Sequence, residues 1–157
     1  MENGQIGSDE FCRKLREHTG KNLSFEDIKW AWMGFIVNVP QYKLDFISEL
    51  RKTYKVYLLS NTNPIVQSWA RSDKFTTAGY PISYYFDKMY TSYEVGITKP
   101  SPAIFEFMIK DTGMNVSETL FVDDGSSNIA VAQRMNFHTL QPENGEDWRN
   151  AICAILR

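Results

Sequence analysis

Apolar and polar positions follow a helical spacing in the first third of the chain. Between Ser8 and Thr53 apolar residues recur every three or four positions, which predicts helices with one inward face. Ser8 can cap the first helix and Gly20 can end it. Ser24 with an acidic residue three positions later predicts a second helix, and Pro40 suits the first turn of a third.

After Thr53 short apolar runs alternate with amphipathic stretches, a pattern typical of strands joined by helical crossovers into a parallel sheet. The run at 56–59 is continuously apolar, as expected for a strand buried on both faces. A loop or broken helix is predicted over 76–85. The predicted strands cover 56–59, 88–91, 120–123 and 137–140, and the predicted helices cover 64–72, 102–111, 126–135 and 146–156.

Composition narrows the class of protein. A chain of 157 residues with 43% hydrophobic content can bury one sizeable core. The formal net charge of −2 supplies no basic field, so we expect no nucleic-acid partner. No window approaches the roughly 18 to 20 apolar residues of a membrane helix and no leader pattern precedes residue 11, so we expect a soluble, cytoplasmic protein without a membrane partner.

Polar groups follow the first predicted strand at Ser60 and Asn61. In open parallel sheets ligands bind beyond the carboxyl ends of the strands, where helix N-termini converge, so hydroxyl and amide groups there can face a phosphate. The alternative is that both residues only form the strand-to-helix turn. Lys99, before Pro100, can neutralise phosphoryl oxygens, although for a single lysine taken alone an ordinary surface position is the default explanation.

Two adjacent carboxylates, Asp123 and Asp124, end the third predicted strand. Neighbouring carboxylates repel each other, and a divalent cation compensates them. Oxygen ligands with retained waters favour Mg²⁺. The alternative is a helix N-terminus stabilised by acidic residues.

Together the segments LLSNT, TKPSPAIF and LFVDDGSSN resemble, in order, the second, third and fourth motifs of the haloacid dehalogenase superfamily. The resemblance covers almost the whole chain. It implies an α/β fold, a three-layer α/β/α Rossmann-like parallel sheet with a partial helical cap at the N-terminus. The cap is expected over residues 1–40 and the core over residues 41–157. The subgroup most similar is the sugar-phosphate phosphatases, such as those acting on glucose 1-phosphate.

The resemblance also implies residue roles. Ser60 and Asn61 are expected to bind the phosphoryl group, and Lys99 to bridge it to the nucleophile, so that Ser60 and Lys99 are the expected catalytic residues. Asp124 is the expected direct Mg²⁺ ligand, with Asp123 beside it or behind it. Asn128 stands where many members have aspartate and is expected to support the site. The implied activity is hydrolysis of a small phosphorylated metabolite through an aspartyl-phosphate.

One family motif is missing. Members begin with a strand ending in Asp-x-Asp, which supplies the nucleophile and the general acid, and these 157 residues contain no such pair. The missing strand is central in the family's sheet. We therefore expect a truncated gene product that is inactive alone. The other explanation is that a second polypeptide or a strand-swapped dimer supplies the strand.

Other functions stay open. One is a non-catalytic phosphate-binding or regulatory protein, and another is a metal-independent haloacid dehalogenase, against which the acidic pair argues. A third is an assembly role, for example in a homo-oligomer, in which apolar cap residues meet another chain. Those residues are Trp30, Trp32, Phe35 and Ile36.

Overall fold

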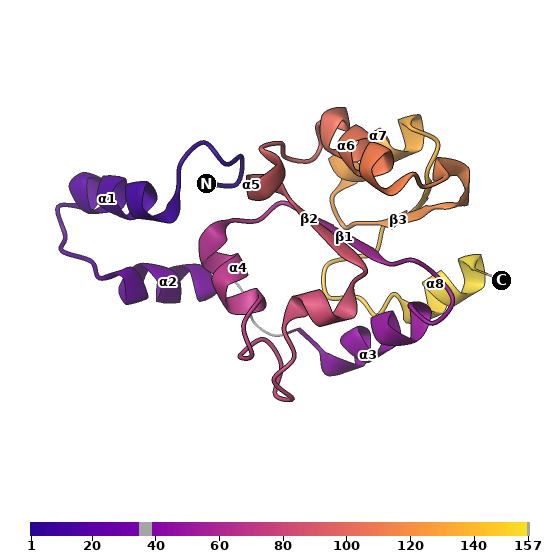
Figure 1. Ribbon diagram of the computed structural model, residues 1–157, viewed down its shortest axis with the longest axis horizontal. Helices are drawn as coiled ribbons and strands as arrows, with labels where there is room; N and C mark the ends of the chain where they lie inside the picture. The colour runs from indigo at the N-terminus through magenta and orange to yellow at the C-terminus, as the bar shows by residue number, and fades with distance from the viewer. Residues whose placement is uncertain (35–38, 157) are drawn as a thin grey trace. The chain divides into compact units, whose positions relative to one another are not determined.

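The computed structural model describes residues 1–34 and 39–156, which form two compact units, Met1–Ile97 and Thr98–Arg157. Phe35 and Ile36, expected on an exposed apolar face, lie outside the described residues. The first unit begins with helices, and its first strand follows them in the chain (Figure 1). Its elements are α1 (Ser8–Thr19), α2 (Phe25–Met33), α3 (Gln41–Leu50), β1 (Tyr57–Ser60), α4 (Pro64–Ala70), η1 (Ile82–Tyr85), β2 (Lys88–Thr91) and α5 (Ser92–Val95).

Local sequence signals explain how the N-terminal helices begin and end. The Ser24 hydroxyl accepts from the Asp27 N–H and the Asp27 carboxylate accepts from the Ser24 N–H, so the predicted capping box is confirmed. Gly20 ends α1 in the left-handed region, as predicted. Ser8 is instead the first helical residue, because Gly7 takes the cap position without a side-chain bond.

The strands of the first unit form a parallel pair in which Ser60 lies opposite Thr91. All four residues of β1 are half-buried, so the expected burial on both faces is not found in this strand. Asn63 caps α4 through its side-chain oxygen, and Pro64 fills the first turn. These two residues set the direction in which the chain leaves β1.

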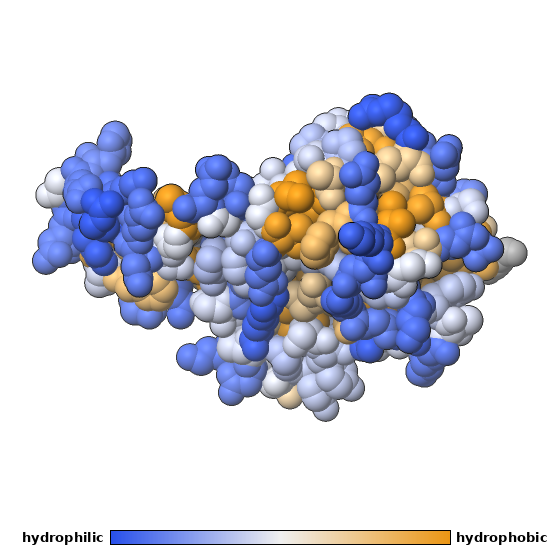
Figure 2. Space-filling view, turned by 45° about the horizontal axis from the view of Figure 1, so that its top comes forward, coloured by the Kyte–Doolittle hydropathy of each residue, from blue (hydrophilic) through white to orange (hydrophobic). Residues whose placement is uncertain are grey.

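Two apolar clusters hold the first unit together. One surrounds Leu44 and Phe75, with Ile47 and Trp69 packed against it. The other joins Cys12 and Ile28 of the N-terminal helices to Ile65 of α4. Ile28 and Ile65 are almost fully buried. The face of α1 and α2 seen in Figure 2 is predominantly hydrophilic, as expected for helices whose apolar side is used in this packing.

The second unit is built around an aromatic core. Its elements are α6 (Pro102–Thr112), η2 (Val116–Glu118), β3 (Leu120–Val122), α7 (Ser126–Arg134), β4 (His138–Leu140) and α8 (Arg149–Ile155). Phe105, Phe121 and Phe137 meet with ring centroids 5.2 to 6.3 Å apart, and Phe105 has no exposed surface. Strands β3 and β4 run parallel, and β3 ends directly before the acidic pair.

The predicted fold class is confirmed: parallel strands alternate with helices in an α/β arrangement. The division of the sequence at residue 40 stays a prediction, as does the missing central strand. In the part of the chain that the structure describes, no helix has the length and apolar character needed to cross a membrane.

Candidate phosphate and metal site

Asp123 is the centre of a dense polar cluster in the second unit. The Lys99 ammonium donates to one carboxylate oxygen at 2.6 Å, and the two side chains are only 9% and 8% exposed. The other oxygen accepts from the Gly125 N–H and from the Asn128 side-chain amide, each at 2.8 Å. Both oxygens of Asp123 are therefore bound by protein donors.

The balance of these contacts keeps Asp123 ionised. Burial raises the pKa of the carboxyl, but the hydrogen bonds from Lys99 and Asn128 and the lysine charge outweigh burial, so the pKa of Asp123 lies below its ordinary value of 3.8. The Lys99 ammonium also lies 5.8 Å from the centroid of the Phe121 ring, which adds a cation–π contact. The lysine is thus held from two directions.

Position 125 has no room for a side chain, so glycine is required there. A Cβ at this position would lie 2.8 Å from the Asn128 amide nitrogen and 3.0 Å from a carboxylate oxygen of Asp123. Any side chain would push apart the Asp123–Asn128 hydrogen bond. The glycine after the acidic pair therefore serves the close approach of these two side chains.

Asp124 differs from its neighbour. It is exposed, and its backbone carbonyl accepts from the Gln141 side chain at 3.3 Å. Within residues 1–34 and 39–156 its carboxylate makes no hydrogen bond or ion pair. In the same residues no group of three or more His, Cys, Asp or Glu side chains is placed to hold a metal ion. Of the acidic pair, Asp124 thus has the exposed carboxylate, whereas both oxygens of Asp123 are hydrogen-bonded.

Ser60 and Asn61 belong to the first unit. Ser60 is the half-buried last residue of β1, and Asn61 is exposed in the loop that leads to α4. The next residue, Thr62, is buried, and its backbone is bound by the Ser92 hydroxyl. The loop is therefore anchored directly after the two predicted phosphate-binding residues.

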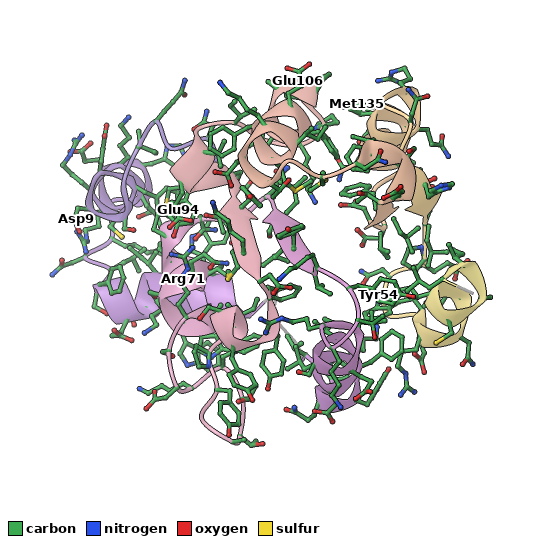
Figure 3. All side chains as sticks on the ribbon, turned by 45° about the vertical axis from the view of Figure 1, so that its right-hand side comes forward. Asp9, Tyr54, Arg71, Glu94, Glu106 and Met135 are labelled. Carbon is green, nitrogen blue, oxygen red and sulfur yellow. The ribbon has the colours of Figure 1, made fainter. Side chains whose placement is uncertain are left out.

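An ion pair connects the segment after β2 to α4. The Arg71 guanidinium donates two hydrogen bonds of 2.7 Å to the two carboxylate oxygens of Glu94, and the Thr91 hydroxyl also donates to Glu94. Figure 3 shows the labelled side chains of Arg71 and Glu94 side by side. Arg71 reaches the Gln67 side chain as well, at 3.2 Å.

This ion pair predicts a pH dependence of stability. The hydrogen bond from Arg71 lowers the pKa of Glu94 below its ordinary value of 4.5. A lowered folded-state pKa means that the stabilisation is fully present above pH 4.5 and is lost as the pH falls through the folded-state value. Because both side chains are about two-fifths exposed, we expect a contribution of only about 0.5 to 1 kcal/mol.

The measurement is urea unfolding at several pH values above and below 4.5 for the wild type and Glu94→Gln. The wild type should be more stable than the variant at neutral pH, and the difference should shrink in acid. Glu106→Gln, on α6, is the control and should follow the wild type. A stability difference that does not change with pH would contradict the assignment.

The structure thus brings together three of the predicted site residues in the second unit, Lys99, Asp123 and Asn128, with Asp124 next in the chain. It places Ser60 and Asn61 at the end of β1 in the first unit. Ser92 and the Arg71–Glu94 pair carry no role in the sequence prediction. The signal for Ser92 was its place directly after the predicted strand at 88–91, which itself ends in the hydroxyl residue Thr91.

A parallel α/β fold with a lysine-bound carboxylate and an exposed carboxylate after a strand is typical of the class of α/β proteins that bind ligands beyond the carboxyl ends of their strands. The comparisons agree with this class. Residues 6–136 match the model of the haloacid dehalogenase-like hydrolase family. The chain therefore belongs to the haloacid dehalogenase-like hydrolases, as its motifs predict.

Individual relatives indicate which kind of haloacid dehalogenase-like hydrolase the chain is similar to. The chain is 53% identical over 156 residues to the D-ribitol-5-phosphate phosphatase of Bacteroides thetaiotaomicron, covering 99% of this chain and 76% of the relative. It is similar to a solved HAD-like family hydrolase from Porphyromonas gingivalis, with 43% identity, a TM-score of 0.97, and coverage of 99% of this chain and 76% of that one.

A third relative was solved with ligands. A HAD family enzyme from Bacteroides thetaiotaomicron, in complex with magnesium and inorganic phosphate, is 42% identical with a TM-score of 0.91, covering 96% of this chain and 76% of that one. The predicted sugar-phosphate phosphatase type is thus the type of the named relative, which acts on a sugar-alcohol phosphate.

Proposed function

We propose that this chain is part of a Mg²⁺-dependent phosphatase that hydrolyses a phosphate monoester of a small sugar or sugar alcohol. The proposal rests on a difference between the two residues of the acidic pair. The carboxylate of Asp123 is hydrogen-bonded to Lys99, Gly125 and Asn128, while Asp124 is exposed. The similarity to a ribitol-5-phosphate phosphatase supports the substrate class.

The residues present fit Mg²⁺. Mg²⁺ in phosphoryl-transfer sites is held by one or two carboxylates together with waters and substrate phosphate, so the exposed Asp124 suffices as a protein anchor. Asp123 serves mainly to hold Lys99. When bound, Mg²⁺ would neutralise charge on the phosphoryl oxygens.

The phosphate itself needs donors. We propose that the Ser60 hydroxyl and the Asn61 amide donate to phosphoryl oxygens, and that the Lys99 ammonium neutralises them while its pairing with Asp123 keeps it charged and oriented. Asn128 supports this arrangement through its hydrogen bond to Asp123.

Turnover also needs a nucleophile. The 157 residues contain no Asp-x-Asp pair, so we propose that the aspartate that forms the phosphoenzyme lies outside them. The 157 residues alone should then bind phosphate without hydrolysing an ester. A non-catalytic phosphate-binding role rests on the same observation.

The test has two parts. Isothermal titration of the 157-residue chain with inorganic phosphate should show binding in the presence of Mg²⁺ and its loss with EDTA. Phosphate release from ribitol 5-phosphate and glucose 1-phosphate should be absent for this chain and present when it is extended by a strand ending in Asp-x-Asp. Turnover by the 157 residues alone would overturn the proposal about the nucleophile. Binding without turnover in the extended chain would favour the non-catalytic role.

A further inference from the structure

The Ser92 hydroxyl binds one residue twice. It accepts a hydrogen bond from the Thr62 N–H at 3.0 Å and donates one to the Thr62 carbonyl at 3.2 Å. Ser92 has no exposed surface, and Thr62 is 7% exposed. A single hydroxyl therefore satisfies both backbone groups of a buried residue that lies thirty positions away in the sequence.

This contact holds the middle of the short loop that joins β1 to α4. At its start, Ser60 is fixed in the parallel ladder opposite Thr91. At its end, Asn63 is 2% exposed and caps α4 by accepting from the Ile65 and Val66 N–H groups. Between these points lie only Asn61 and Thr62, and the Ser92 hydroxyl holds Thr62.

Losing the hydroxyl would leave two buried backbone groups of Thr62 without their partner. A buried polar group without a hydrogen bond is unfavourable, so the loop would shift until both groups reached water or another partner. Such a shift would carry the Asn61 side chain and the end of β1 away from their present directions. Small displacements of binding groups have large effects on ligand affinity.

We infer that Ser92 is a positioning residue that fixes the direction of the phosphate-binding groups of Ser60 and Asn61 through its two hydrogen bonds to Thr62. The inference rests on the proposed phosphate-binding function. Ser92 acts through the loop and does not touch the phosphate.

The chain contains a matched control. The Thr76 hydroxyl makes the same pair of hydrogen bonds to Tyr80, donating to its carbonyl at 3.0 Å and accepting from its N–H at 2.8 Å. That loop carries none of the proposed phosphate or metal residues. Thr76→Val therefore removes the same two bonds as Ser92→Ala, away from the site, with a methyl group in place of the hydroxyl.

The test measures Ser92→Ala, Thr76→Val and the wild type in two ways. Hydrogen exchange followed by NMR should show that the Thr62 amide exchanges at least about tenfold faster in Ser92→Ala only, because its acceptor is gone. Isothermal titration with inorganic phosphate and Mg²⁺, well below the unfolding temperature, should show a dissociation constant raised about tenfold or more in Ser92→Ala and unchanged in Thr76→Val.

Three results would overturn the inference: an unchanged exchange rate at Thr62, unchanged phosphate affinity in Ser92→Ala despite faster exchange, or an equal loss of affinity in Thr76→Val. The last would mean that general destabilisation weakens binding. Absence of phosphate binding in the wild type would instead be a failure of the proposed function, and the exchange rate at Thr62 would still decide whether Ser92 fixes the loop.

Discussion

Replacing Lys99 by methionine is expected to have two effects. It should abolish Mg²⁺-dependent phosphate binding, and it should destabilise the second unit. The ammonium is the cation held beside the acidic pair, and its loss should weaken phosphate binding by about 100-fold or more. It also leaves the Asp123 carboxylate buried without its counter-charge. Removing one partner of a buried ion pair costs about 3 to 5 kcal/mol.

A double variant separates the two effects. Lys99→Met with Asp123→Asn removes both charges, while the asparagine carbonyl can still accept from the Gly125 N–H and the Asn128 amide. Stability should return most of the way to the wild-type value, because no uncompensated charge remains buried. Phosphate binding should stay lost.

Urea unfolding and phosphate titration measure the two quantities. Lys110→Met on α6 is the control, since Lys110 is exposed and in the same unit, and it should leave both unchanged. Wild-type phosphate affinity in Lys99→Met would show that Lys99 has only a structural role. Unchanged stability in Lys99→Met would contradict the buried ion pair.

Replacing Asp124 by asparagine is expected to have the opposite profile. The side chain is exposed, so the free energy of unfolding should change by no more than about 0.5 kcal/mol. Phosphate binding in the presence of Mg²⁺ should nevertheless fall about 100-fold, because an amide is a much poorer ligand than a carboxylate for a hard cation. Asp123→Asn alone should instead destabilise the protein, because it leaves Lys99 without its carboxylate partner.

Direct titration with MgCl₂ and thermal unfolding test this contrast. Glu106→Gln removes a carboxylate that extends outward from α6 in Figure 3 and serves as the charge control. It should leave Mg²⁺ affinity unchanged. Equal Mg²⁺ affinity in Asp124→Asn and the wild type would assign the metal to other residues.

Signals confined to a few neighbouring residues predicted the elements well. The Ser24 capping box and the glycine stop at Gly20 both depend on local backbone geometry, and each is found. The short helix α5 was not predicted. Its four residues are too few to show a helical period.

The start of the last helix was predicted three residues too early. Glu146 and Asp147 suggest an acidic first turn, but the Glu146 carboxylate accepts from the Glu143 N–H and Asp147 accepts from the Arg149 N–H. These bonds form a turn before α8, which begins at Arg149. The sequence alone does not show which of the two arrangements an acidic side chain takes.

The site was predicted by residue type and order, and its internal contacts were not. The resemblance gave Asp123 and Asp124 different roles, but it did not predict that one is buried and the other exposed, because that difference comes from which carboxylate faces Lys99. The contact between Ser92 and Thr62 depends on the pairing of β1 with β2. Such contacts join residues far apart in the chain and become visible only in the folded structure.

The hydrogen bonds to both carboxylate oxygens of Asp123 limit how the metal preference of the site can be engineered. Both of its oxygens are committed to nitrogen donors, so a redesign toward softer ions such as Mn²⁺ or Co²⁺ would gain nothing from substitutions at position 123 and would risk the fold. Randomised libraries aimed at a new ion should therefore vary Asp124 and leave its neighbour fixed.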